Sequence, residues 1–254
     1  PPAGGGRPLL LVHGAFAGAW CWSKHFLPYF AKQGFRAYAL SFSGHGGSPG
    51  RERLDWLSIA DYVRDLEQAV GAVAGDPVLI GHSMGGFVVQ KYLERAAAPG
   101  VVLMATVPPQ GLLSASIALA FSNPGLFADL NTMLHSGRAS LATLQYALFG
   151  STVAPDELKA YYRLMQPESQ RAMWDMTCFD LPRLARERCP PLLVLGAESD
   201  ILVPPSQTEQ AARFYGVQAE IFPGMVHVMM LEVRWQTVAD RIIEWLRAEK
   251  LDGA

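Results

Sequence analysis

Short apolar runs alternate with longer amphipathic stretches along most of this chain. Consecutive apolar residues bounded by turns are typical of strands buried on both faces of a parallel sheet. Such strands are predicted at residues 8–12, 35–42, 78–80, 100–105, 192–195 and 219–222. Helical spacing of apolar residues predicts helices at 20–33, 59–73, 87–94 and 233–248, the second begun by a capping box of Ser58 and Asp61. The alternation predicts an α/β fold with a mostly parallel sheet covered by helices on both faces.

The alternation stops between residues 108 and 188. Five helical patterns rich in Leu, Ala, Met and aromatic residues follow one another there, at 112–121, 126–136, 140–149, 155–165 and 168–177. Ligands of open α/β sheets bind outside the carboxyl ends of the strands, where such an insertion would lie. We therefore predict a core of residues 1–107 and 189–254 and a helical cap of residues 108–188. The Pro- and Gly-rich residues 1–6 are expected to form a loose leader.

Composition narrows the classes of function. The chain has 254 residues, of which 50% are hydrophobic and 17% charged, and this predicts a globular protein with a sizeable core. A net charge of −2 without a basic patch argues against nucleic acid as a partner. No apolar run approaches the roughly 18 residues of a membrane span. The scattered Cys21, Cys178 and Cys189 suit free thiols in a reducing cytoplasm and have no His at a metal-ligand spacing.

The segment Gly81-His82-Ser83-Met84-Gly85 fits the G-x-S-x-G pattern of a nucleophile elbow. A buried strand precedes it and a helical pattern follows it. A sharp turn at Ser83 strains its backbone and brings the chain on either side into contact, so glycine is needed at 81 and 85. The turn also places Ser83 at a helix N-terminus, where negative charge is favoured. Ser83 is the predicted nucleophile; the alternative is an incidental serine in a glycine-bounded loop.

A serine nucleophile needs a histidine base and a carboxylate that orients it, on loops after later strands. His227 follows the strand at 219–222 and is the predicted base. Asp200 follows the strand at 192–195 and is the predicted acid, with Glu198 as its rival and helix capping as the alternative role of Asp200.

The remaining histidines are expected to have other roles. His13 and His45 lie in glycine loops and are expected to shape them by hydrogen bonds, although either could edge the pocket. His82 adjoins the nucleophile, and its side chain must point away from Ser83 if the turn is as described.

An oxyanion formed on attack needs fixed N–H donors. The N–H of Met84, directly after the nucleophile, is one candidate. The loop after the first strand should supply the other, with Ala15 as first choice and Phe16 as second, because Gly14 lets the backbone approach closely. Trp20 and Trp22 are expected in the core of the following helix.

Five stretches in this order together resemble motifs of the α/β-hydrolase family: 11–14, 44–48, 81–85, 196–204 and 224–232. The resemblance covers nearly the whole chain and implies Ser83, Asp200 and His227 as a catalytic triad. It is nearest to the capped esterase branch that includes plant methylesterases and hydroxynitrile lyases. The lyases carry threonine in place of Gly14 and lysine in place of Val228, which argues against lyase chemistry. A serine nucleophile also excludes the aspartate route of epoxide hydrolases and haloalkane dehalogenases.

The sequence thus predicts a serine hydrolase that cleaves a small or medium carboxylic ester with an apolar group, through an acyl-enzyme. Neither a metal nor an organic cofactor is implied, and a monomer or homodimer is expected. Candidate residues of the pocket lining are Phe16, Phe121, Leu126, Met133, Phe149, Trp174 and Val228. Alternatives are a C–C bond hydrolase, a lactonase or amidase, a cofactor-free perhydrolase, and a small-molecule receptor that retains the triad.

Overall fold

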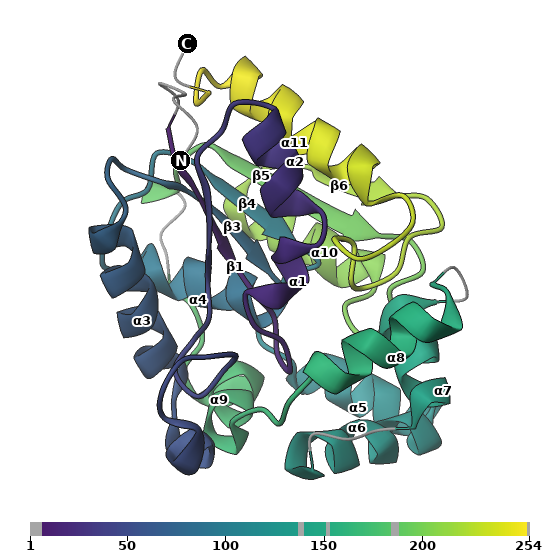
Figure 1. Cartoon of the computed structure of the whole chain (residues 1–254). Coiled ribbons are helices and arrows are strands. Elements are labelled where there is room, and N and C mark those ends of the chain that lie inside the picture. The colour runs from purple at the N-terminus through teal and green to yellow at the C-terminus, as the bar shows by residue number, and fades with distance from the viewer. Residues whose placement is uncertain (1–6, 137–139, 151–152, 184–187, 253–254) are drawn as a thin grey trace.

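The core is built on a parallel sheet of six strands in the order β2-β1-β3-β4-β5-β6, seen in the computed structural model (Figure 1). The structure describes residues 7–136, 140–150, 153–183 and 188–252; the predicted leader lies outside them. The strands are β1 Leu9–Val12, β2 Ala37–Leu40, β3 Val78–His82, β4 Val101–Met104, β5 Leu192–Ala197 and β6 Ala219–Phe222. All six lie where they were predicted. β2 is shorter than residues 35–42 because its one neighbour, β1, pairs with it over four residues only.

Helices cover both faces of the sheet (Figure 1). One face packs against α1 Trp20–Ser23, α2 Phe26–Lys32 and α11 Trp235–Ala248, and the other against α3 Ile59–Ala72, α4 Met84–Tyr92 and α10 Pro205–Tyr215. Side chains of a strand alternate between its faces. Leu9 and Leu11 accordingly belong to the first hydrophobic cluster, and Leu10 belongs to the second. The sheet is therefore apolar on both sides, as its continuous hydrophobic strands predict.

A local signal in the sequence accounts for the start of α3. The predicted capping box begins α3: Ser58 accepts from the Asp61 N–H, and the Asp61 carboxylate accepts from the Ser58 N–H. The single helix expected over residues 20–33 is interrupted at Lys24 and His25, giving α1 and α2. A short 3₁₀ helix, η1 Arg51–Trp56, was not predicted.

The described residues between β4 and β5 form helices and connecting segments that lie beyond the carboxyl ends of the strands (Figure 1). They are α5 Leu113–Ser122, α6 Pro124–Ser136, α7 Leu141–Leu144, η2 Gln145–Phe149, α8 Pro155–Leu164, α9 Gln170–Trp174 and η3 Asp175–Phe179, of which η2 and η3 are single π turns. Residues 108–188 are called the cap below. Polar bonds join the cap to the core: Lys24 Nζ lies 2.6 Å from Glu157 Oε1, and the Ile59 N–H donates to Asp175 Oδ2.

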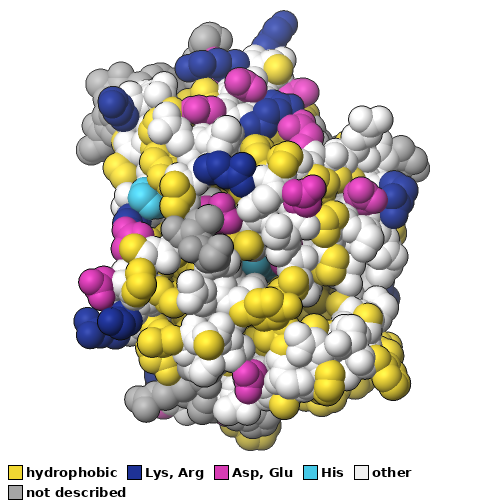
Figure 2. Space-filling model, turned by 90° about the vertical axis from the view of Figure 1, so that its right-hand side faces the viewer, with side chains coloured by type: hydrophobic (Ala, Val, Ile, Leu, Met, Phe, Trp, Pro, Cys, Tyr) yellow, Lys and Arg dark blue, Asp and Glu magenta, His cyan; other side chains and the backbone are white. Residues whose placement is uncertain are grey.

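The surface differs between cap and core. In Figure 2, charged side chains gather over the upper part of the face, whereas hydrophobic side chains gather over the lower part, where the cap lies in Figure 1. In the described part of the chain, no helix combines the length and apolar character needed to cross a membrane.

Candidate active site

Ser83 lies at the turn from β3 into α4, with a strained backbone of φ 51° and ψ −118°. A Cβ on Gly81 would lie 2.7 Å from the Gly86 Cα. A Cβ on Gly85 would lie 2.4 Å from the carbonyl oxygens of Val12 and His13. The predicted need for glycine at 81 and 85 is met, and only the explanation for Gly85 changes. Gly81 does meet the chain after Ser83 as predicted, since its added Cβ would also lie 2.8 Å from the Gly85 carbonyl oxygen, whereas Gly85 faces the end of β1.

Ser83, His227 and Asp200 lie in one hydrogen-bonded line. The Ser83 Oγ is 3.0 Å from His227 Nε2, and His227 Nδ1 is 2.7 Å from Asp200 Oδ2. The other oxygen of Asp200 accepts from the N–H groups of Leu202 and Val203, each at 2.9 Å. Because an ionised carboxylate only accepts, His227 donates from Nδ1 and is left with Nε2 as the acceptor for the Ser83 hydroxyl. The arrangement can take a proton from a serine nucleophile.

Neighbouring polar groups hold the loop that carries His227. Glu198, the rival acid, is exposed and accepts from the Gly224 N–H at 2.7 Å instead of facing His227. His82 Nε2 lies 2.9 Å from the His227 carbonyl oxygen. Burial and the nearby His227 ring hold the pKa of His82 well below its usual range. The neutral ring therefore donates to that carbonyl and fixes the backbone of the base.

The peptide between Gly14 and Ala15 is held in one orientation by His13. His13 Nε2 accepts from the Phe42 N–H at 3.2 Å, and Nδ1 lies 2.8 Å from the Gly14 carbonyl oxygen. Burial, and then the nearby His45, lower the pKa of His13 to about 3, so Nδ1 carries the one proton and donates it. Since the peptide bond is planar and trans, the Ala15 N–H points opposite to the Gly14 carbonyl.

Two backbone N–H groups are therefore available beside Ser83. Ala15 and Met84 both line the cavity that Ser83 faces. Among the residues that the structure describes, no backbone or side-chain acceptor takes a hydrogen bond from either N–H. The second choice for this role, the Phe16 N–H, donates to Glu168 Oε2 at 3.3 Å and is occupied. The geometry thus favours Ala15 over Phe16 as partner of Met84.

The cavity above Ser83 has a volume of about 330 Å³ and lies between the core and the cap. Of the predicted lining residues, Phe16, Met133, Phe149 and Val228 do line it. Trp20 also lines it, contrary to the expectation of a core position, whereas Trp22 is fully buried.

Three predicted lining residues lie outside this lining. Phe121 is 86% exposed, because α5 turns Ala115, Leu119 and Ser122 toward the cavity and Phe121 away from it. Trp174 is 59% exposed at the end of α9. Leu126 is buried in the hydrophobic cluster that joins the cap to the sheet. All three fit the apolar pattern of the cap, but this pattern does not distinguish lining, core and surface positions.

The cavity is lined mainly by apolar residues, with a few uncharged polar ones such as Ser116, Asn131 and Gln207. None of the described residues that line it is Asp, Glu, Lys or Arg. Of the nine methionines, six contribute to the lining: Met84, Met133, Met165, Met173, Met176 and Met230. Methionine side chains are flexible, so the wall can adapt to apolar groups of different shape. In the described part of the chain, no three His, Cys, Asp or Glu side chains are placed to hold a metal ion together.

The model of the alpha/beta hydrolase family matches residues 9–241. The chain belongs to the alpha/beta hydrolase family. Esterase PIR7B of Oryza sativa subsp. japonica is 37% identical over 112 residues, which cover 41% of this chain and 41% of that protein. Methyl jasmonate esterase 1 of Vitis vinifera is 40% identical over 92 residues, 35% of this chain and 34% of the relative. The match thus spans about two fifths or less of the length of these plant relatives.

Solved structures show that the hydrolase fold extends over the chain. The crystal structure of polyneuridine aldehyde esterase matches with a TM-score of 0.74 at 18% identity, covering 94% of this chain and 98% of that one. A methylesterase from Arabidopsis matches with a TM-score of 0.72 at 17% identity, covering 95% and 99%. At these identities the likeness concerns the fold. The predicted α/β-hydrolase fold is therefore confirmed.

Sequence reasoning missed Glu168 and Gln166, which contact the loop after β1. Residues 168–177 were expected to form a helix, but α9 begins after Ser169, whose side chain caps it. The contacts of Glu168 join residues that are far apart in the chain, and no local pattern marks them.

Proposed function

We propose that this chain is a serine hydrolase that cleaves uncharged carboxylic esters with an apolar acyl or alcohol group, through an acyl-enzyme. The observation that carries the proposal is the line Ser83–His227–Asp200 at an apolar cavity free of charged side chains among its described residues. Relatives that are named esterases support ester hydrolysis as the reaction.

The reaction follows from the hydrogen bonds of the site. The Ser83 Oγ attacks the ester carbonyl carbon while His227 Nε2 takes its proton, and Asp200 stabilises the resulting imidazolium. The N–H groups of Ala15 and Met84 receive the oxyanion. The tetrahedral intermediate collapses, the C–O bond breaks, and the alcohol leaves with the proton from His227. Water, deprotonated by His227, then attacks the acyl-enzyme and releases the acid and free Ser83.

The cavity supports the substrate class. A volume of about 330 Å³ lies at the small end of the range for ligand pockets, about 300–1,000 Å³, which fits a small or medium ester. A carboxylate on the substrate would be buried without a charged partner, which is strongly unfavourable. Neutral esters should therefore be preferred by at least about tenfold in kcat/KM over esters with a free carboxylate, since roughly 1.4 kcal/mol suffices for that factor.

The test compares wild type with Ser83→Ala on p-nitrophenyl acetate, butyrate and octanoate. Loss of the nucleophile should lower kcat by roughly 10⁴- to 10⁶-fold. A fluorophosphonate should add one equivalent of mass to the peptide that contains Ser83. Ser116→Ala is the matched control, because this serine also lines the cavity, from α5. It should keep both turnover and labelling. Wild-type protein that neither turns over these esters nor forms the adduct would contradict the proposal.

A further inference from the structure

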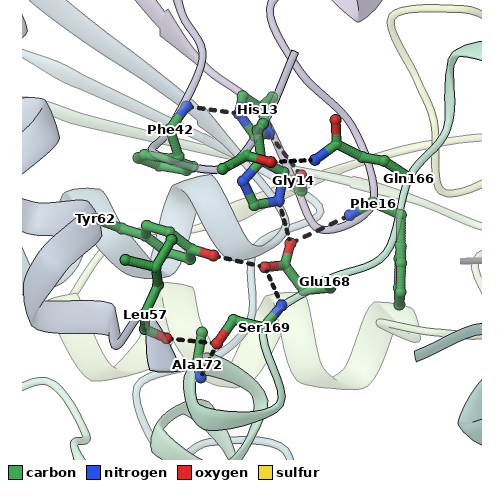
Figure 3. Close-up of polar contacts among 12 residues, drawn as sticks. His13, Gly14, Phe16, Phe42, Leu57, Tyr62, Gln166, Glu168, Ser169 and Ala172 are labelled. Atoms are coloured by element: carbon green, nitrogen blue, oxygen red, sulfur yellow. Dashed lines mark hydrogen bonds and ion pairs between the residues drawn. The ribbon is translucent and has the colours of Figure 1, made fainter. Parts of the chain in front are cut away.

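The cap contacts the loop after β1 through residues 166–168, which lie between α8 and α9 (Figure 3). Both backbone polar groups of Phe16 are held there. The Phe16 N–H donates to Glu168 Oε2 at 3.3 Å, and the Phe16 carbonyl accepts from the Gln166 N–H at 3.1 Å. Phe16 has a φ of 64°, a left-handed conformation that a side chain with a Cβ rarely adopts. This conformation persists only where surrounding bonds hold it, and here the cap supplies them.

Gln166 ties the same segment to the turn after β2. Its Oε1 accepts from the Gly46 N–H at 2.9 Å and from Arg51 Nη2 at 2.5 Å. Its Nε2 donates to the Gly44 carbonyl at 3.1 Å. Residues 166–168 are therefore held against the core by the turn after β2 as well as by Phe16. Their position does not depend on the bonds to Phe16 alone.

The Glu168 carboxylate is fully buried and receives four hydrogen bonds. Oε2 faces His45 Nε2 at 3.0 Å in addition to Phe16, and Oε1 accepts from the Tyr62 hydroxyl at 2.8 Å and from the Ser169 N–H at 2.7 Å. Because each of its oxygens accepts two hydrogen bonds, the carboxylate has little freedom to rotate. Figure 3 shows it between Tyr62 and Phe16.

His45 carries the charge that balances Glu168. Its Nδ1 lies 3.0 Å from the Ser43 carbonyl, so both ring nitrogens face acceptors and both must donate. Burial alone would lower the pKa of His45, but the Glu168 carboxylate and the two hydrogen bonds raise it; the Arg51 charge opposes this. Burial alone would raise the pKa of Glu168, but His45 and the surrounding donors lower it. The neutral His13 ring lies 5.2 Å from His45.

We infer that Glu168 is a positioning residue of the oxyanion hole, through which the cap fixes the orientation of the Ala15 N–H. Ala15 lies between two peptides that are both held: His13 holds the carbonyl of the Gly14–Ala15 peptide, and Glu168 holds the N–H of the Ala15–Phe16 peptide. Removing the second restraint frees Phe16 to leave its left-handed conformation and leaves His13 as the one restraint described for the Ala15 N–H, which is then aimed less firmly at the oxyanion. The inference rests on the proposed function.

The main test is Glu168→Ala, which removes the acceptor of the Phe16 N–H. Because it leaves the buried His45 unpaired and can destabilise the fold, a second variant, Glu168→Ala with His45→Gln, removes both charges. Rates are expressed per site titrated with fluorophosphonate, so that unfolded molecules do not count. A displaced oxyanion donor should lower kcat/KM by about 10- to 100-fold in both variants. Tyr62→Phe, the control, loses a donor to Oε1 but keeps the Phe16 bond, and should stay within about threefold of wild type.

Two inhibitors separate positioning from a purely structural role. A trifluoromethyl ketone forms a tetrahedral adduct with an oxyanion, whereas the methyl ketone of the same skeleton only fills the cavity. The inhibition constant of the first should rise in step with the loss of kcat/KM in Glu168→Ala, while that of the second stays within about twofold. Equal shifts for both ketones, or full activity per titrated site, would overturn the role of Glu168. Wild-type protein without esterase activity would instead count against the proposed function.

Discussion

Replacing Gly85 with alanine should damage both the stability of the fold and the active site. The added Cβ would lie 2.4 Å from two backbone carbonyl oxygens at the end of β1, those of Val12 and His13. Ordinary contacts of a Cβ begin at 3.4 Å, so the start of α4 and the end of β1 must separate by about 3.4 − 2.4 = 1.0 Å. No flexible side chain is available to absorb this shift, because both contacts are backbone.

The expected magnitude follows from that separation. Overpacking of a core generally destabilises by about 1–3 kcal/mol, and a rigid backbone contact belongs at the upper end or beyond it. For a chain of this size, about 3 kcal/mol corresponds to a fall in Tm of roughly 6–12 °C. The same movement displaces Ser83 from His13 and from the loop after β1. A misplacement of about 1 Å lowers catalytic rates by on the order of 100-fold.

Gly71→Ala is the matched control. Gly71 lies in α3, is exposed, and has nothing within 4 Å of an added Cβ. Because Gly71 lies in the last turn of α3, the substitution should be neutral or stabilise the fold by up to about 0.5 kcal/mol, since glycine costs less there than in a helix interior. Urea denaturation gives both free energies of unfolding, and ester turnover per titrated site gives the effect on catalysis. If Gly85→Ala unfolds at the same urea concentration as wild type and keeps its activity, the close packing of α4 on β1 described here is wrong.

Three further predictions concern the acid, the cavity wall and the buried ion pair. Asp200→Asn should lower kcat by about 10³- to 10⁴-fold per titrated site without changing the fold, because the amide favours the wrong tautomer of the base. Phe149→Ala, at a wall position that is 1% exposed, should destabilise by about 3–5 kcal/mol in urea denaturation, whereas Phe121→Ala, at 86% exposure, should change stability by less than about 0.5 kcal/mol. The stabilisation that His45 contributes relative to His45→Gln should be present near pH 5.5 and shrink as the pH rises through the folded pKa, which is raised above 6.5; a stability difference that grows with pH would contradict this. Glu168, whose pKa is lowered in the folded state, should contribute to the free energy of unfolding above about pH 4.5. This contribution should be lost as the pH falls further, which acid unfolding measures.

The sheet and the residues around Ser83 could be predicted because their signals are local. Each strand is a short apolar run, and Ser83, Asp200 and His227 each follow one of these strands by a short loop. Parallel strands present their carboxyl ends at the same edge, so order along the chain translates into proximity in space. For this reason the three side chains are joined by hydrogen bonds, although they are far apart in the chain. Their catalytic role stays a prediction until Ser83→Ala is measured.

The cap was harder to interpret, because its residues are apolar on several sides at once. Helical spacing identifies an amphipathic helix only when one face is polar. In α5 the residues at the cavity are Ala, Ser and Leu, while Leu113, Ile117 and Phe121 are exposed, so hydrophobicity points to the wrong face. Breaks in the helices add to this: the π turns η2 and η3 shift the register of the following residues. Phe121 and Trp174 were assigned to the pocket because they are apolar residues of the cap.

The contacts of Glu168 give the cap a role beyond enclosing the substrate. A lid that only covered Ser83 could be displaced without changing the orientation of the N–H groups beside it. Here Phe16 belongs to the cavity wall through its side chain and to the cap contact through its backbone. A substrate that pushes against the Phe16 ring therefore acts on the same residue whose backbone the cap restrains. If Glu168 positions the oxyanion donor as inferred, the shape of the acyl group and the strength of the oxyanion hole are coupled at Phe16. Variants of Glu168 should then alter the ranking of acetate, butyrate and octanoate esters as well as the rate. An equal loss of kcat/KM for all three esters would show that the shape of the acyl group and the strength of the oxyanion hole are independent.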